Sequence, residues 1–184
     1  MKDETKLKEH VDIFIDEMKR CSNGGAKAGA FLIGVCVIDT MASFYKARLL
    51  GNHKKDMRQF RAFMHKYMSR YSTRNGFTTE YFYKYVRCGL VHKLSLSDKV
   101  SSGSNNFVTG KFLLTDNRPD DHFKKRNGRV VLNLENFMAD IELARDKFFS
   151  DDVYHNNILW KAFEGAGCID ASTLPGTGFG ELSC

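Results

Sequence analysis

The feature that most constrains the fold is a long apolar segment, residues 27–50, whose apolar side chains fall on nearly every helical face. Residues 31–38 alone could form a buried strand, but no turn signal interrupts the pattern before Gly51-Asn52. A helix that is apolar all round must be covered by other elements. The segment therefore predicts a long central helix with the other elements packed around it.

Apolar residues at helical spacing predict further helices on both sides of this segment. Thr78 or Thr79 is expected to cap one of them, with Glu80 in its positive first turn. Only two prolines occur, which favours a mainly helical chain over a sandwich of many strands. The helices are expected at about residues 4–20, 54–71, 78–92, 135–149 and 153–163.

Two short strands are expected at residues 111–115 and 129–134, joined by a charged connection that carries His122. The simplest model is a β-ribbon over about residues 111–134, inserted before the C-terminal helices, with His122 in a mobile loop. Residues 1–164 are then one domain, and the Gly/Ser/Thr-rich residues 165–184 a flexible tail.

Charge and cysteine usage indicate a cytoplasmic protein without a membrane span, metal or other cofactor. The charged residues 1–10 do not resemble a secretory signal, and the apolar run Ala28–Ile38 is short for a bilayer and ends at Asp39. The five cysteines are scattered and show no zinc-binding spacing.

A basic segment lies between Lys46 and Arg74 and contains nine Lys and Arg residues but only one acid, Asp56. Aromatic residues are interleaved with these cations. The segment could neutralise nucleic-acid phosphates, or it could be a solvated helix face whose aromatic residues enter the core. The candidate nucleic-acid contacts are Lys54, Lys55, Arg58, Arg61, Lys66, Arg70 and Arg74, joined by Lys124, Lys125 and Arg126 at the tip of the ribbon.

Arg87 and His92 stand five residues apart at the end of an amphipathic segment. The arginine fork suits a phosphate, and histidine moves protons near neutral pH. On a regular helix the two side chains differ by about 140° in direction. Either the helix loosens at Gly89, or a second copy supplies its own pair across a two-fold axis. Apolar Tyr81, Cys88 and Val91, on a face otherwise expected to be wet, favour the second arrangement.

Residues 87–92, Arg-Cys-Gly-Leu-Val-His, resemble the R-x4-H motif of HEPN (higher eukaryote and prokaryote nucleotide-binding) domains. The resemblance implies an up-and-down helical bundle that dimerises, and many members are metal-independent endoribonucleases. Glu80 and Lys84 stand where some members carry an acidic and a basic residue. Cys88 occupies a position that is often Asn, Asp or His in active members.

The reaction implied by the resemblance is cleavage of single-stranded or looped RNA by attack of the ribose 2′-OH. His92 would move the proton and Arg87 would stabilise the phosphate oxygens. Glu80 would either hold Arg87 or pair with Lys84. A toxin or defence role would add an antitoxin or regulatory protein as partner.

Two alternatives stay open. One is a catalytically inactive HEPN-like dimer that binds nucleic acid or a protein partner. The other is a helical dimerisation module unrelated to nucleic acid.

Overall fold

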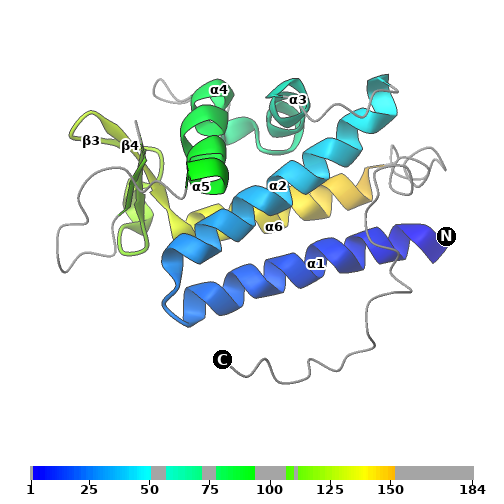
Figure 1. Cartoon of the computed structure of the whole chain (residues 1–184), viewed down its shortest axis with the longest axis horizontal. Helices are drawn as coiled ribbons and strands as arrows, with labels where there is room; N and C mark the ends of the chain where they lie inside the picture. Colours follow the sequence, from blue (N-terminus) through cyan, green and yellow to red (C-terminus); the bar gives the residue numbers. More distant parts are fainter. Residues whose placement is uncertain (1, 51–56, 72–77, 94–106, 110–111, 152–184) are drawn as a thin grey trace.

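The computed structural model describes residues 2–50, 57–71, 78–93, 107–109 and 112–151 (Figure 1). Side chains are described for residues 6–45, 57–71, 78–91 and 112–151. The helix expected at residues 153–163 and the tail expected at 165–184 lie outside the described residues.

The helical body is built around α2 (Lys27–Leu50), as its apolar sequence predicts. It packs against α1 (Lys2–Asn23), α3 (Met57–Tyr67) and α6 (Leu134–Ser150). Figure 1 shows α1 and α2 as an antiparallel pair with α6 behind α2 and α3 above it. The turn between α1 and α2 contains Gly25, whose φ of +82° is a conformation that favours glycine. The expectation of a mainly helical chain with a central helix is confirmed.

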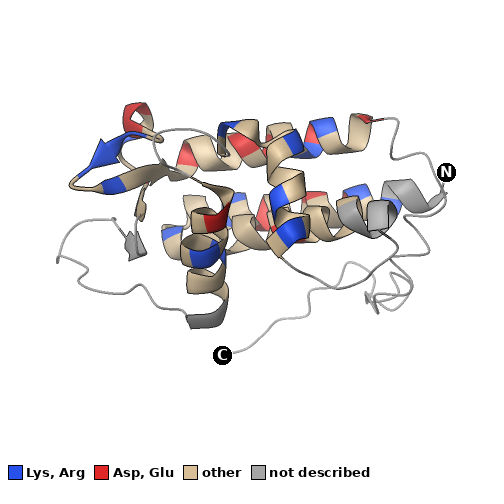
Figure 2. Ribbon diagram, turned by 90° about the horizontal axis from the view of Figure 1, so that it is seen from above, with Lys and Arg blue, Asp and Glu red and all other residues tan. Residues whose placement is uncertain are grey.

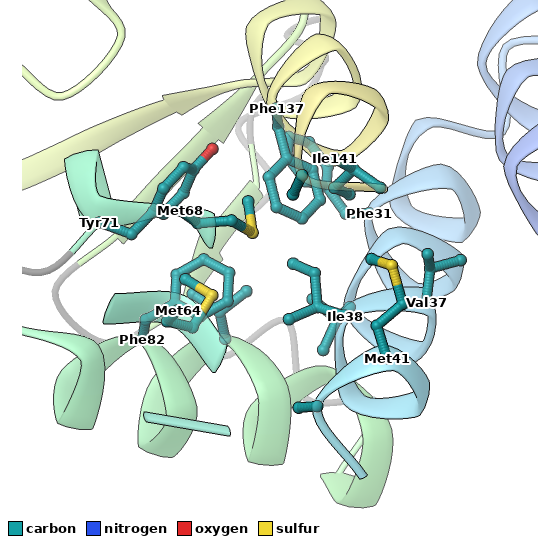
Figure 3. Packing of buried hydrophobic residues seen from close by; sticks show 14 of the residues in the cluster. Phe31, Val37, Ile38, Met41, Met64, Met68, Tyr71, Phe82, Phe137 and Ile141 are labelled. Carbon is teal, nitrogen blue, oxygen red and sulfur yellow. The ribbon is translucent and has the colours of Figure 1, made fainter. Parts of the chain in front are cut away.

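The core is dominated by aromatic and long apolar side chains that meet around α2 (Figure 3). Phe31 and Ile38 of α2 are fully buried and face Phe137 and Ile141 of α6. Gly34 lies at the crossing of α1, α2 and α6, where a larger residue would meet side chains of both neighbours. Close packing at this crossing fixes the position of α2, and with it the position of every polar residue that α2 carries.

Residues 79–93 form a further helical stretch that packs against α2. We call it the motif helix because it contains Arg87 and His92. It consists of α4 (Thr79–Tyr81), the π-helix η2 (Phe82–Arg87) and α5 (Cys88–Lys93). Thr78 caps it by accepting a 3.2 Å hydrogen bond from the backbone N–H of Tyr81. The cap was predicted from the sequence, whereas the π-helix was not.

The predicted helix at residues 54–71 is divided in the structure. Its described part consists of α3 and a separate short 3₁₀ helix, η1 (Ser69–Tyr71). The tighter turn directs the Tyr71 side chain into the core, where it is fully buried.

The β-structure is a four-stranded sheet at one end of the helical body, so the expected β-ribbon is wrong (Figure 1). The strands are β1 (Phe107–Thr109), β2 (Phe112–Thr115), β3 (Lys125–Arg126) and β4 (Arg129–Asn133), in the order β1-β2-β4-β3. The two predicted strands, β2 and β4, pair in parallel, which a hairpin cannot do. A parallel pair needs a connection of about a dozen residues, and residues 116–128 supply it.

That connection is itself structured. It contains the 3₁₀ helix η3 (Pro119–Asp121), then β3, and then a tight turn at Asn127-Gly128 that leads into β4. Both turn residues have positive φ, 50° and 74°, as a two-residue hairpin turn requires.

By length and composition alone, the part of α2 from Lys27 to Tyr45 is long and apolar enough to cross a membrane. The expectation that the apolar run is too short for this does not hold for the whole helix. Half of this apolar stretch is buried inside the fold, and the core helix of a soluble protein can be equally long and apolar.

Candidate functional site

The candidate site lies where the motif helix crosses α2. Arg87 donates from Nη2 to Oδ2 of Asp39 on α2, at 2.8 Å. The Arg87 side chain is 13% exposed and that of Asp39 27%. The centre of the guanidinium also lies 5.2 Å from the ring centroid of Tyr83, one helical turn earlier. Arg87 is therefore held by a carboxylate and by an aromatic face.

Two cysteines flank this ion pair, and we call Cys36, Asp39, Tyr83, Arg87 and Cys88 the Arg87 cluster. Burial lowers the pKa of Arg87, but the hydrogen bond and the charge of Asp39 outweigh it, so that the pKa is raised. For Cys36, desolvation and the Asp39 charge raise the pKa more than the Arg87 charge lowers it. At neutral pH the cluster thus holds a cationic arginine and a protonated Cys36 thiol.

The backbone of the motif helix changes type at Arg87, since η2 ends there and α5 begins at Cys88. Gly89 lies in the regular α5, so the helix does not loosen at Gly89. It loosens one turn earlier, in the π-helix. The offset of about 140° between Arg87 and His92 therefore persists in the backbone. His92 lies in α5, while its side chain is outside the described part of the chain.

Glu80 and Lys84 take up contacts other than those expected. Glu80 accepts a 2.8 Å hydrogen bond from Nη1 of Arg61 on α3, so it binds neither Arg87 nor Lys84. Nζ of Lys84 lies 5.5 Å from the ring centroid of Tyr85. Asp39 holds Arg87, which was one of the two roles considered for Glu80. Asp39 could have been singled out from the sequence, because it is the only charged residue between Lys27 and Lys46.

Most of the described candidate nucleic-acid contacts form ion pairs with acids that lie far away in the sequence or across a turn. Figure 2 shows acidic and basic residues interspersed along the helices. Lys54, Lys55 and Arg74 lie outside the described residues, and Arg58 and Lys125 are exposed. Ion pairs join Arg61 to Glu80, Lys66 to Asp151, Arg70 to Asp140, and both Lys124 and Arg126 to Asp121.

A second polar cluster joins the sheet region to the helices, and sequence reasoning missed it. Asp140 of α6 accepts from the hydroxyl of Tyr71 at 3.0 Å and lies 3.3 Å from Nε2 of His122. Nδ1 of His122 accepts the backbone N–H of Asn133 at 3.1 Å, which leaves the ring proton on Nε2 for Asp140. We call Arg70, Tyr71, His122 and Asp140 the Asp140 cluster.

The expectation that His122 lies in a mobile loop is wrong, since its side chain is 6% exposed. η3 and β4 hold His122 against α6, and no local sequence pattern predicts this contact. Beside the cluster is a small pocket of about 40 Å³, lined by residues that include Arg70, Asp140 and Lys147. Its size suits a few water molecules.

Among the described residues, no group of three or more His, Cys, Asp or Glu side chains is arranged to hold a metal ion. Comparison of the chain with protein-family models, with curated proteins and with solved structures gives no match. The geometry of the Arg87 cluster and the R-x4-H resemblance are therefore the two features of this chain that bear on its function.

Proposed function

We propose that this chain is a HEPN-type bundle that acts as a homodimeric, metal-independent endoribonuclease with Arg87 and His92 in the cleft between the two copies. The observation that carries the proposal is the fixed guanidinium of Arg87. Arg87 lies on the same helix as His92 and is held at 2.8 Å by Asp39 of α2. A cation held in place before the reaction stabilises developing phosphate charge without reorganisation. The motif helix follows the three helices α1 to α3, as the helical patterns in the sequence predict.

In the proposed reaction, the ribose 2′-oxygen attacks the adjacent phosphorus while the bond from phosphorus to the 5′-oxygen breaks. His92 takes the proton of the 2′-OH or delivers one to the leaving 5′-oxygen. Arg87 donates hydrogen bonds to the non-bridging oxygens, whose negative charge grows in the transition state. The products are a 2′,3′-cyclic phosphate and a free 5′-hydroxyl, so protons and bonds balance without a metal.

The backbone offset between the two residues supports a dimeric site. Because positions 87 and 92 are about 140° apart around the helix axis, a two-fold axis is the simplest way to bring an arginine and a histidine to one phosphate. Such an arrangement also places two histidines in one cleft, one for each proton transfer.

The second candidate is a catalytically inactive dimer of the same type that binds nucleic acid or a protein partner, such as an antitoxin or regulatory protein. The low exposure of the Arg87 side chain, at 13%, favours this alternative. Cys88, in the place of the more usual polar residue, favours it as well.

The deciding experiment is cleavage of a mixed-sequence single-stranded RNA in EDTA by the parent, His92→Ala, Arg87→Ala and His65→Ala. His65 is an exposed histidine of α3 and serves as the matched control. We expect His92→Ala to lower the rate by about 100-fold or more, and His65→Ala to leave it unchanged. If the pure, folded, dimeric parent does not cleave, the enzyme proposal fails, and salt-dependent RNA retention then tests the binding alternative.

A further inference from the structure

We infer that Asp39 is the positioning residue of the site, holding the Arg87 guanidinium in the orientation in which it meets the phosphate. The inference rests on the proposed function, and it adds a residue 48 positions away from Arg87 that the R-x4-H motif does not include. Asp39 acts through Arg87 and does not itself touch the RNA.

The geometry of the pair permits this role. The carboxylate takes a hydrogen bond from Nη2, and the Tyr83 ring lies against the guanidinium at 5.2 Å. A guanidinium carries five N–H donors in a rigid fork, so one carboxylate and one phosphate can be bound together. With one end and one face fixed, the direction of the remaining donors is fixed as well.

The place of Asp39 in the fold makes the support rigid. Its neighbours Ile38 and Met41 are fully buried, and α2 is packed on several sides by other helices. A group on a packed helix holds its partner more accurately than one on a loop, because neither its backbone nor its surroundings can shift cheaply.

Stability alone does not account for an acid at this position. Removing a charge from water is costly, and replacing a buried ion pair with well-packed apolar residues is often neutral or stabilising. Asp39 interrupts an otherwise uncharged run from residue 28 to residue 45. A carboxylate that the packing of α2 does not require, but that fixes an arginine, fits a positioning role.

The electrostatics predict which kinetic constant depends on Asp39. Arg87 stays cationic without Asp39, because arginine is always charged near neutral pH. Loss of Asp39 therefore changes the position of the cation and not its protonation. Turnover should fall, while the shape of the pH profile, which reports on His92, should stay the same.

The first test compares Asp39→Asn with Asp140→Asn, which removes the charge of another partly buried, arginine-paired acid, 12% exposed. For Asp39→Asn we expect kcat on single-stranded RNA to fall by about 100-fold with little change in KM. Asp140→Asn should lower the thermal midpoint and leave kcat unchanged. An unchanged or higher kcat in Asp39→Asn, or an equal fall in both variants, would overturn the inference.

The second test has a readout besides cleavage, namely the thermal midpoint of Arg87→Ala with and without methylguanidinium. The truncated side chain leaves a space beside the Asp39 carboxylate, so we expect methylguanidinium to raise this midpoint and to restore part of the cleavage. Arg87→Ala/Asp39→Asn and the parent should show neither effect. Absence of both effects in Arg87→Ala would overturn the inference.

The two tests separate failure of the inference from failure of the proposed function. Cleavage by the parent that Asp39→Asn does not impair leaves the function and removes the inference. If the parent does not cleave at all, the function fails, and the positioning role in cleavage fails with it. A rise in the midpoint on adding methylguanidinium would then show only that Asp39 binds a guanidinium.

Discussion

Tyr71 shows at the residue scale how a buried hydroxyl links stability to pH. It is fully buried and donates to Asp140 at 3.0 Å. Burial first, and then the charge and hydrogen bond of Asp140, raise the pKa of Tyr71 well above its ordinary value. Its contribution to stability is fully present below the unfolded pKa of about 10, and is lost as the pH rises from there through the folded pKa.

Replacing Tyr71 with Phe tests this link. We expect Tyr71→Phe to lower the free energy of unfolding at pH 7 by about 1 kcal/mol, because one hydrogen bond to Asp140 is lost. Above pH 10 the variant should lose stability less steeply than the parent. Urea unfolding between pH 7 and 10.5 measures both effects. Tyr45→Phe, on a half-buried tyrosine of α2, is the control that should follow the parent. An equal alkaline slope in parent and Tyr71→Phe would contradict the assignment.

Single residues also mark the limit of what the sequence could predict of the site. The chemistry of Arg87 and His92 follows from residue type and spacing, which are local. Their partners do not, because the Asp39–Arg87 and Tyr71–Asp140 pairs join residues 48 and 69 positions apart. Only the packing of helices decides which of many acids meets which cation. The lone charge of Asp39 in an apolar helix was the one available signal.

At the scale of elements, the crossing of α1, α2 and α6 depends on a glycine. A Cβ on Gly34 would lie 2.7 Å from a ring carbon of Phe137, 2.9 Å from Cδ1 of Ile141 and 2.9 Å from Sδ of Met18. We expect Gly34→Ala to lower the free energy of unfolding by about 1–3 kcal/mol, because the helices must move apart. This cost exceeds the gain of about 1 kcal/mol in helix propensity.

Gly29, in the same helix, provides the control. A Cβ there would meet its nearest neighbour, Sγ of Cys21, at 3.7 Å, an ordinary contact. Gly29→Ala should therefore raise the free energy of unfolding by up to about 1 kcal/mol. Urea unfolding of the two variants beside the parent measures the difference, and effects of the same sign would contradict the close approach at Gly34.

Elements also differ in how far the sequence determined them. The bounds of α2 follow from its apolar run and its flanking turn signals, and they were predicted correctly. The strands β2 and β4 were found by composition, but their parallel pairing was not. Alternation and propensity indicate that a segment is extended, while the direction of its partner depends on the connection between them. Here that connection folds into η3 and β3, and in doing so it buries His122.

At the scale of the whole molecule, the proposed function requires two copies in contact through the motif helix. Tyr81 and Val91 are each 36% exposed on this helix, at its two ends. Apolar side chains left exposed beside a candidate site are suited to burial by a second copy. The offset between Arg87 and His92 around the helix is a second, independent reason to expect a dimer.

Placing a charge on this surface tests the dimer and the site together. We expect the parent to have twice the chain mass of 21.0 kDa by light scattering, and Val91→Glu to be a monomer that does not cleave RNA. In an apolar two-fold interface, the new carboxylate would be desolvated and would lie near the same carboxylate of the second copy, so the dimer should dissociate. Ile13→Glu changes a residue of α1 that is 54% exposed, and it should stay dimeric and active. A Val91→Glu monomer that still cleaves would show that each copy carries a complete site, and would refute the dimeric mechanism.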